Sequence, residues 1–233
     1  MIERAMVVTA HPDDAETGAA GTVAKLVREG VEVTYVIVTK GNAGSENRTM
    51  TPDQLATIRT AEQTSAADTL GVKHVEFLGY GDGEVADTRD LRRDITRQIR
   101  RWRPDLVITQ NPHRTRNFFA SHRDHRITGG AVLDCVYPLA RDHMAFPELL
   151  PDYEPHKVGE IYIIKWSEED HELAVDISET MELKLRAIAC HQSQFRDFPR
   201  MEAYVRARCA ALGKTHGYAY AETFDRILLT AQR

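Results

Sequence analysis

Residues 5–14 read Ala-Met-Val-Val-Thr-Ala-His-Pro-Asp-Asp, an apolar run that ends in an imidazole and two carboxylates. The first six residues are typical of a buried strand, and the small residues at 18–21 indicate that a helix follows. In an open parallel sheet, ligands bind at the edge where strands end and helices begin. We therefore expect His11 and Asp14 to face one point as metal ligands, while Asp13 points past them at a bound water.

Segments with strand and helix patterns alternate along the chain, which predicts a parallel sheet covered by helices. The run 31–39 is rich in β-branched residues and is the clearest second strand. Thr51 and Pro52 indicate a helix start, as the N-cap and the first helical residue. The expected strands are 5–10, 31–39, 74–78, 105–109 and 160–166, and the expected helices are 17–28, 52–70, 91–102, 127–139, 180–191 and 200–212. The expected fold class is α/β, a Rossmann-like three-layer sandwich with a mostly parallel central sheet.

The composition of the 233 residues limits the kind of protein that the chain can be. The length suits a single domain, with a core at about 5–195 and a C-terminal helical segment at about 196–233. A net charge of −5 gives no electrostatic case for binding nucleic acid. No apolar run approaches the roughly 20 residues of a membrane span, and the first strand starts too early to leave room for a secretory signal. Cys135, Cys190 and Cys209 are odd in number and widely spaced, so we expect reduced thiols and a cytoplasmic location.

A second polar motif, Ser121-His122-Arg123-Asp124-His125, follows the expected strand at 105–109. The first motif alone cannot complete a metal sphere, because a catalytic zinc usually keeps three protein ligands and one open position. Two histidines and one carboxylate, His11, His125 and Asp14, match that number. The two motifs are therefore expected to meet at one metal site.

The other two members of the second motif, His122 and Asp124, form a pair that can move protons beside a metal. Each motif also has a simpler interpretation. Asp14 could merely cap a helix, but a cap explains neither His11 nor Asp13. The second motif could be a solvated charged loop. Either motif alone is a weak signal, whereas both at strand ends in one chain are a strong one.

The segment Ala10–Glu16 together with His122–His125 resembles the LmbE-like (PIG-L) family of metal-dependent N-deacetylases. Further matches follow in the order that the family has. They are Ile58-Arg59-Thr60-Ala61-Glu62, Leu78-Gly79-Tyr80-Gly81-Asp82-Gly83 and His191-Gln192-Ser193-Gln194. The resemblance covers nearly the whole chain.

The resemblance implies one zinc ion held at the positions of His11, Asp14 and His125, with Asp13 as the general base. One position departs from the family, which usually has proline where this chain has Arg123. Arg123 is next to the expected site without being a ligand. The departure therefore bears on the charge of the preferred substrate more than on metal binding.

Hydrolysis of an amide requires an activated water, a stabilised oxyanion and a protonated leaving amine. Asp13 is expected to take the proton of the attacking water. A protonated His122, oriented by Asp124, is expected to stabilise the oxyanion. Either Asp13 or His122 then protonates the departing amine, and the sequence leaves that alternative open.

Members of the family remove acetyl groups from N-acetylglucosamine units of small glycosides, glycolipids or antibiotic precursors, so the resemblance implies such a substrate. The positions of Arg59 and Asp82 are expected to hydrogen-bond sugar hydroxyls, since a guanidinium and a carboxylate suit a diol. The alternative for Arg59 is an ion pair with Glu62 on a helix surface. His191 is expected near a substrate pocket, in its own or a neighbouring subunit, and outside the metal sphere.

Because family members are often oligomeric, we also expect a homo-oligomer. The loop 138–155 is spaced by prolines and is a candidate lid. Its side chains Phe146, Leu149 and Leu150 are expected to be exposed and suited to a subunit contact. A second loop, Gly41-Asn42-Ala43-Gly44, lacks the spacing of a dinucleotide site and is expected to shape the pocket wall.

Two functions outside the deacetylase class use some of the same features. A non-haem iron oxygenase also binds its metal through two histidines and a carboxylate, but such sites usually lie on all-β barrels. A non-catalytic sugar-binding module could keep the fold, but binding alone does not require Asp13. The sequence therefore favours the deacetylase.

Overall fold

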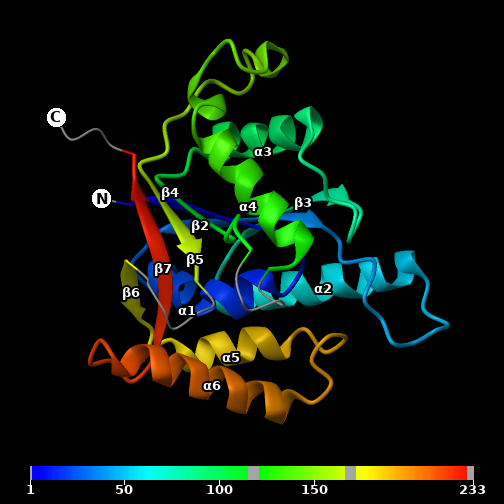
Figure 1. The fold of residues 1–233 in the computed structure, drawn as a ribbon, viewed down its shortest axis with the longest axis vertical. Coiled ribbons are helices and arrows are strands. Elements are labelled where there is room, and N and C mark those ends of the chain that lie inside the picture. Colours follow the sequence, from blue (N-terminus) through cyan, green and yellow to red (C-terminus); the bar gives the residue numbers. More distant parts are fainter. Residues whose placement is uncertain (1, 115–120, 166–171, 230–233) are drawn as a thin grey trace.

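The computed structural model describes residues 2–114, 121–165 and 172–229 (Figure 1). The strands are β1 Arg4–Thr9, β2 Glu32–Thr39, β3 His74–Tyr80, β4 Leu106–Thr109, β5 Glu160–Ile164, β6 Leu173–Asp176 and β7 Ala221–Leu228. The helices are α1 Asp14–Arg28, α2 Pro52–Leu70, α3 Arg89–Trp102, α4 Arg123–Val136, α5 Met181–Ala189 and α6 Phe198–Lys214, with short 3-10 turns η1 Leu139–Arg141 and η2 Pro147–Leu149.

Within the described residues, seven strands form one sheet in the order β3-β2-β1-β4-β5-β7-β6. The pairs from β3 to β5 are parallel, whereas β7 runs antiparallel to both of its neighbours, β5 and β6. The α/β class and the mostly parallel central sheet are therefore confirmed.

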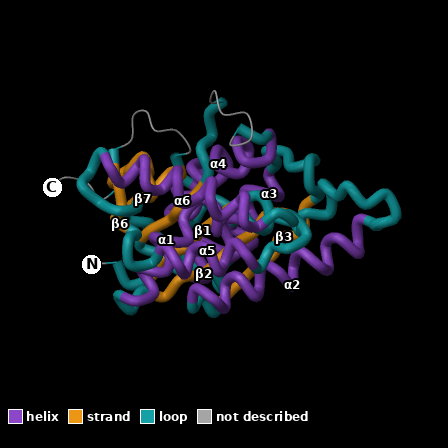
Figure 2. The backbone as a smooth tube through the Cα atoms, turned by 90° about the horizontal axis from the view of Figure 1, so that it is seen from below, coloured by secondary structure: helices purple, strands orange, loops and turns teal. Residues whose placement is uncertain are grey.

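Helices cover both faces of the sheet, with α3 and α4 on one side and α1, α2, α5 and α6 on the other (Figure 1). Figure 2 shows the molecule from the side of α5 and α6, so that these two helices lie in front of the strands. Neighbouring residues of β1 serve opposite faces, because side chains alternate along a strand. Val7 packs in the core beneath α1 and α2, and Met6 and Val8 pack in the core beneath α3 and α4. Burial on both faces explains why β1 is apolar throughout.

The expected start of α2 is confirmed in detail. The Thr51 hydroxyl accepts from the backbone N–H of Gln54, the Gln54 side chain accepts from the backbone of Thr51, and Pro52 is the first helical residue. This reciprocal capping satisfies two backbone donors at the helix start. Helix α4 differs from expectation, since it begins at Arg123 rather than at 127. The second motif therefore forms the first turn of α4 instead of a loop before it.

The C-terminal segment is not helical throughout, as was expected for 196–233. Helix α6 ends at Lys214, and β7 then enters the sheet between β5 and β6. The strand pattern of β7 is obscured in the sequence because Glu222 is fully buried within it. The expected fifth strand ends at Ile164, and its last residue, Trp166, lies outside the described residues.

The loop 138–155 folds onto α3, and two of the three apolar side chains expected to be exposed are buried. Phe146 and Leu149 are only 7% and 8% exposed, so their expected role in a subunit contact is wrong. The buried guanidinium of Arg100 in α3 donates to several backbone carbonyls of this loop, those of Leu139, Ala140, Asp142 and Ala145. The sequence suggested exposure because the prolines imply a free loop, whereas the buried arginine draws the loop inward.

Candidate metal centre and active site

The two polar motifs meet at the carboxyl ends of β1 and β4. His11 follows β1, and the side-chain oxygen of Gln110, just after β4, accepts from the backbone N–H of Ala10 (2.9 Å). Helix α4 packs closely against this point, since a Cβ on Gly129 would overlap the carbonyl oxygen of Gln110. The absence of a side chain at Gly129 therefore lets α4 bring His125 to the edge where His11 lies.

The three expected ligands come together with donor atoms at the spacing of a metal site. His11 Nδ1 lies 3.2 Å from His125 Nε2 and 3.3 Å from Asp14 Oδ2, and His125 Nε2 lies 3.1 Å from Asp14 Oδ1. Donors around a tetrahedral zinc with bonds of about 2.0–2.1 Å lie roughly 3.3 Å apart. All three residues are less than 9% exposed. The donor set therefore fits zinc in chemistry, spacing and burial.

The other ring nitrogen of His11 faces two further carboxylates. His11 Nε2 lies 3.1 Å from Asp82 Oδ1 and 3.3 Å from Asp124 Oδ2. A metal-binding histidine commonly donates its second N–H to a carboxylate, which fixes the tautomer and the ring orientation. His11, Asp82 and Asp124 also lie close enough together to form a second group that could hold a metal ion. Donation from Nε2 accounts for this cluster without a second ion.

Acidic side chains dominate the electrostatics of the site. Burial lowers the pKa of His11, but hydrogen bonds with Asp124, Asp14 and Asp82 outweigh burial and raise the pKa to about 12. Burial in turn raises the pKa of Asp14, but His125 and His11 hold it well below its ordinary value. The surrounding carboxylates thus favour a positive charge at the centre of the site, which a bound divalent ion would supply.

Asp13 is the N-cap of α1 in an unusual backbone conformation. Its φ of 90° lies in the left-handed region, and its side chain makes no capping hydrogen bond. The Asp14 carboxylate instead accepts from the backbone N–H of His11 (2.7 Å). Neither acid caps the helix with its side chain, so the simpler interpretation of the motif is excluded. Burial raises the pKa of Asp13 to about 6, against the lowering effect of Arg59.

The second motif departs from expectation in how Asp124 and His122 are paired. The Asp124 carboxylate is fully buried and accepts from the backbone N–H of Gly83 (2.6 Å) as well as facing His11. Its backbone N–H, not its carboxylate, contacts His122, donating to Nδ1 at 3.3 Å. Burial and the neighbouring His11 and His125 lower the pKa of His122. A neutral His122 that accepts at Nδ1 carries its proton on Nε2.

His122 is also close enough to be a metal ligand. His11, His122 and His125 can offer ring nitrogens to one point, and the His122 ring centroid lies 5.0 Å from that of His11. The carboxylate of Asp14 competes with His122 for the role of third ligand, and it has direct contacts of 3.1–3.3 Å to both other donors. These contacts support Asp14 as the ligand.

Arg123, the position that departs from the family, ties a neighbouring loop to α4. Its guanidinium donates to the backbone carbonyls of Val85 and Gly83 and lies 3.6 Å from Asp124 Oδ1. The loop that it contacts carries Asp82. Arg123 therefore helps to hold one side of the site.

Arg59 of α2 is buried against the first motif. Its Nη2 donates to the carbonyl of Pro12 (2.8 Å) and to Asp13 Oδ2 (3.2 Å), and its Nη1 donates to the carbonyl of Gly41 (3.3 Å). Gly41 has a φ of 60°, and a Cβ there would lie 2.5 Å from the guanidinium. Asp82 Oδ2 lies 3.7 Å from Arg59 Nη1. Arg59 and Asp82 thus lie together, as recognition of a diol would require.

The alternative of a surface ion pair between Arg59 and Glu62 is excluded. Glu62 instead accepts from the backbone N–H and the hydroxyl of Ser193, both at 2.7 Å. This contact fixes the His191–Gln194 segment against α2. His191 itself is fully buried, with Nε2 3.1 Å from Glu16 Oε2.

A cavity of about 540 Å³ opens over the metal donors. It is lined by His11, Asp13, Asp14, Thr17, Ala43, Gly44, Arg59, Asp82, Gly83, His122, His125, Phe195 and Met201. Ala43 and Gly44 belong to the glycine loop after β2, so the expectation that this loop shapes the pocket wall is confirmed. Phe195 and Met201 have no chemical motif that could have marked them in the sequence. Among the described residues, neither His191 nor any part of the loop 138–155 lines this cavity, so the loop is not a lid over it.

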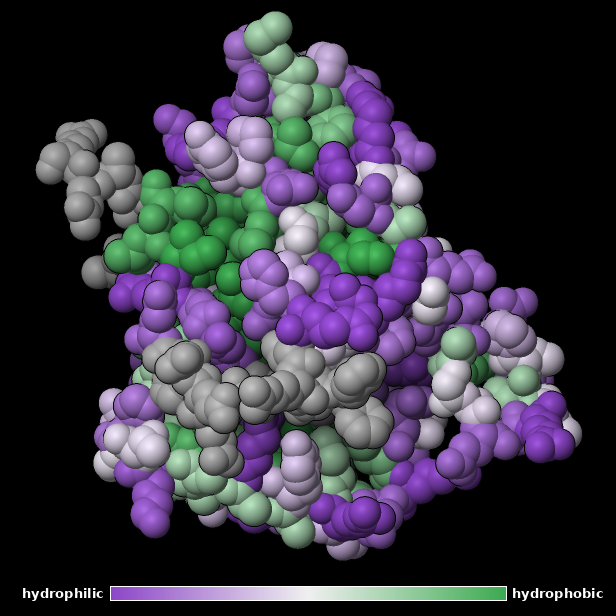
Figure 3. All heavy atoms as spheres, viewed as in Figure 1, coloured by the Kyte–Doolittle hydropathy of each residue, from purple (hydrophilic) through white to green (hydrophobic). Residues whose placement is uncertain are grey.

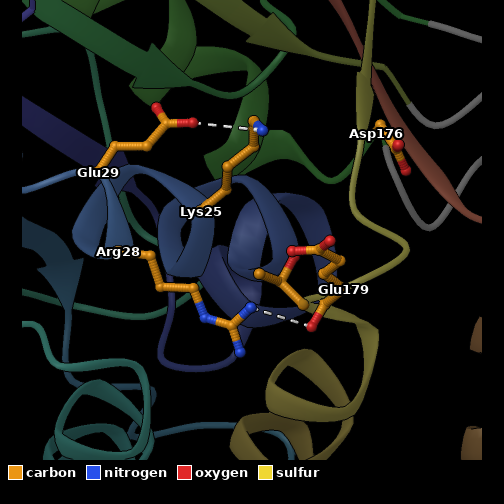
Figure 4. Close-up of a pocket in the computed structure, with 6 residues that line it drawn as sticks. Lys25, Arg28, Glu29, Asp176 and Glu179 are labelled. Atoms are coloured by element: carbon orange, nitrogen blue, oxygen red, sulfur yellow. Dashed lines mark hydrogen bonds and ion pairs between the residues drawn. The ribbon is translucent and has the colours of Figure 1, made fainter.

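A second pocket, of about 270 Å³, lies on the surface near the end of α1 (Figure 4). Lys25 and Glu29 form an ion pair at 3.3 Å, and Arg28 donates to the backbone carbonyl of Glu179 at 3.2 Å. None of the residues that line this pocket belongs to a group that could hold a metal ion among the described residues. The cavity over the metal donors is therefore the better candidate for catalysis.

Comparison with known proteins agrees with this site. A model of the PIG-L family, described as GlcNAc-PI de-N-acetylase, matches residues 6–136. A diacetylchitobiose deacetylase of Thermococcus kodakarensis is 31% identical over 95% of this chain and 82% of its own length. A probable N-acetyl-alpha-D-glucosaminyl L-malate deacetylase 2 of Bacillus anthracis is 30% identical over 82% of this chain and 80% of its own.

A solved structure supports the same assignment over the whole fold. The N,N'-diacetylchitobiose deacetylase of Pyrococcus horikoshii, in complex with an inhibitor, has a TM-score of 0.90 and 32% identity. The match covers 97% of this chain and 84% of that one. The chain belongs to the PIG-L family and is an enzyme, a deacetylase that hydrolyses an amide bond. A catalytic function is thus favoured over the oxygenase and the binding module.

Proposed function

We propose that this deacetylase uses zinc to remove the acetyl group from an N-acetylglucosamine-type sugar in a small glycoside or conjugate. The observation that carries the proposal is the convergence of His11, Asp14 and His125 on one point beneath the cavity. The relatives named above are deacetylases of acetylated glucosamine compounds. Residues suited to bind a metal and residues suited to bind a sugar line the same cavity, which supports the proposal.

Zinc bound by these three residues would polarise the amide carbonyl and lower the pKa of a water molecule. Asp13 lines the cavity beside the donors and holds a carboxylate that no helix cap engages. It takes the proton of the attacking water as general base. Arg59 keeps one Asp13 oxygen in place at 3.2 Å and leaves the other oxygen for this step.

His122 stands on the cavity wall as the hydrogen-bond donor to the oxyanion. Its Nδ1 accepts from the Asp124 backbone, which leaves Nε2–H to donate. The lowered pKa of His122 makes this donor neutral rather than charged before reaction. Asp13, which holds the proton taken from water, is then the group that protonates the departing amine.

The cavity has a polar part and an apolar part, and we assign a role in substrate binding to each. Arg59 and Asp82 offer paired polar atoms for sugar hydroxyls on one wall. On another wall, Phe195 from the segment between α5 and α6 and Met201 from the start of α6 offer apolar atoms. A sugar ring has polar edges and apolar faces, so a cavity with both kinds of surface suits it.

A metal analysis combined with an amine-release assay tests the proposal. The purified chain should contain one zinc and should release amine from N,N'-diacetylchitobiose or another N-acetylglucosaminide. Nε-acetyl-lysine is the matched amide without a sugar and should not react. Activity should disappear with a chelator and return with zinc, and His11→Ala and His125→Ala should lose the ion. His143→Ala, which alters an exposed histidine, is the control. A zinc-loaded, folded protein that releases amine from no acetylated sugar would overturn the proposal.

We also propose that the chain works in the cytoplasm as a homo-oligomer. Cys135, Cys190 and Cys209 are free thiols, as a reducing compartment would keep them. Among the described helices, none is long and apolar enough to cross a membrane. Apolar atoms gather on the surface beside the end of β7 that is nearest the C-terminus (Figure 3), where Ile227 and Leu229 are only partly buried. A contiguous apolar surface of this kind supports a contact with a second copy.

A further inference from the structure

Behind Asp13 lies a chain of polar side chains that solvent does not reach. Gln63 of α2, Glu16 of α1 and His191 after α5 are each 0% exposed. The Asp13 backbone N–H donates to Gln63 Oε1 at 3.0 Å, and Gln63 Nε2 donates to Glu16 Oε1 at 2.9 Å. The other Glu16 oxygen lies 3.1 Å from His191 Nε2. Burial of several polar groups is costly unless each is paired, so this network has a specific arrangement to maintain.

The polarity of the network is fixed along its whole length. A backbone N–H can only donate, so the Gln63 oxygen must face Asp13 and its NH₂ must face Glu16. A carboxylate can only accept, so Glu16 receives a proton donor from Gln63 on one oxygen and from His191 on the other. No member can turn over without breaking a hydrogen bond. The orientation of Gln63 is therefore set by the Asp13 N–H on one side and by the buried Glu16–His191 pair on the other.

Asp13 is the member of this arrangement that needs support. Its φ of 90° places a non-glycine residue in the left-handed region, which is a strained conformation that its surroundings must maintain. The hydrogen bond from its N–H to Gln63 helps to hold that conformation from behind, while Arg59 holds the carboxylate. A base that shifts by about 1 Å can lose on the order of 10² in rate.

We propose that Gln63 is a positioning residue for Asp13, and that the buried Glu16–His191 pair acts on catalysis by fixing Gln63. His191 thus influences the reaction through this network and not by contact with the sugar. The inference rests on the proposed role of Asp13 as general base. It goes beyond the proposed function because none of these three residues touches the metal donors or the substrate cavity.

The test begins with Gln63→Met, which keeps the size of the side chain and removes both hydrogen bonds. The expected result is a fall in kcat of about 10²-fold, with KM and zinc content unchanged. Gln98→Met is the matched control, because Gln98 is another buried glutamine, on α3, that bonds to Trp102. Its variant should lose stability without a change in kcat.

A reversed pair separates positioning from general stability. Gln63→Glu alone places a second carboxylate against that of Glu16. Glu16→Gln alone makes two amides face each other, so that one hydrogen bond is lost. Both single variants should therefore have a lowered kcat. The double variant restores every hydrogen bond, since Glu at 63 accepts from Asp13 and from the amide now at 16, whose oxygen accepts from His191. Its kcat should recover to within about tenfold of the parent, the scale of a modest hydrogen-bond difference.

Hydrogen exchange provides a readout that does not depend on activity. In the substrate-free protein, a peptide that contains Asp13 should exchange faster in Gln63→Met than in the parent or in Gln98→Met. If the parent deacetylates no acetylated sugar, the proposed function fails, and the exchange result still tests the network. The inference is overturned if Gln63→Met keeps the parental kcat, if its defect lies in zinc content or KM, if exchange is unchanged, or if the double variant is no faster than either single variant.

Discussion

Asp13 and Asp14 are neighbours in sequence, yet their carboxylates face different partners. Asp14 lies against His11 and His125, and Asp13 lies against Arg59. Two adjacent carboxylates repel each other, and here each charged carboxylate is stabilised by its own cation or hydrogen-bond donors. The left-handed backbone at Asp13 is what separates them. One acid can then serve the metal while the other remains available to a proton.

Asp13→Asn should keep zinc and lose hydrolysis. The amide side chain fills the same space and can still accept from Arg59, but it cannot take a proton from water. The expected fall in kcat is about 10²–10⁴-fold. Metal analysis and amine release on the same preparation would measure both effects. An unchanged rate at saturating substrate would remove Asp13 from the mechanism.

His122 and Asp124 should fail in different ways. His122→Ala removes the donor to the oxyanion, so its rate should fall by about 10²–10³-fold while zinc content stays near normal. Asp124→Asn alters the acceptor of the second His11 N–H, so its main effect should be zinc affinity weakened by about 10–100-fold. Competition with a chelator and rate measurements at saturating zinc separate the two. Loss of the ion in His122→Ala with its retention in His125→Ala would instead make His122 the ligand.

The sequence could mark the residues around the metal because each belongs to a motif at a strand end. It could not show which atom of Asp124 faces His122, since that depends on where α4 begins. Gln63 could not be marked at all. A glutamine within a helix is typical of a solvent face, and only the packing of α2 against α1 buries it beside Glu16.

At the scale of elements, Arg100 organises the loop 138–155. One guanidinium of α3 donates to four loop carbonyls at 2.7–3.2 Å. The planar guanidinium of arginine has several N–H donors in fixed directions, so it can bond carbonyls that lie on different sides of it. The single ammonium of lysine cannot do so. The loop therefore owes its order to a side chain that the sequence presents as one of many charges on an amphipathic helix.

Arg100→Lys should loosen this loop and leave the active site intact. Loss of two or three hydrogen bonds, each contributing about 1 kcal/mol, should speed amide exchange in 139–150 by roughly 30–150-fold. Hydrogen exchange by mass spectrometry measures this, with deacetylation as the second readout. Arg97→Lys, on the same helix and 40% exposed, is the control. Equal exchange in the two variants would show that the loop is ordered by its apolar contacts instead.

Element positions were predictable where patterns are local and failed where tertiary contacts decide. Thr51 and Pro52 specify the start of α2 by themselves. Strand β7 joins the sheet through pairing with distant strands, and its buried Glu222 depends on Lys184 from another element. No local pattern contains that information.

At the scale of the whole molecule, one buried ion pair joins three elements. Lys184 of α5 lies 2.7 Å from Glu222 of β7 and also donates to the carbonyls of Glu16 and Thr17 in α1. Glu222 accepts in turn from the backbone of Gly21 and Thr22. The pair connects the first helix of the fold to its last strand.

Lys184→Met should destabilise the protein by about 3–5 kcal/mol, because it leaves Glu222 charged and buried without its partner. Urea unfolding followed by circular dichroism measures this change. Lys25→Met, which removes an exposed partner of Glu29, should change stability by less than about 1 kcal/mol. If the two variants were equally stable, the backbone donors of α1 would suffice to hold Glu222.

The arrangement of the helices leaves one part of the sheet available for assembly. Helices α3 and α4 pack mainly on β1 and β4. Ile227 of β7 and Leu229, the residue after its end, pack beside that core, next to the apolar surface seen in Figure 3. Exposure of an apolar surface to water costs free energy, and contact with a second copy of the chain would remove that cost.

Light scattering at micromolar concentrations should therefore show an oligomer for the parent chain. Ile227→Glu should shift the population toward monomer, because a carboxylate is costly to bury in an apolar contact. Met144→Glu is the control, since Met144 is 76% exposed and lies outside this surface. A parent that is monomeric across this range would refute assembly. An oligomer that persists in Ile227→Glu would move the interface to another face of the molecule.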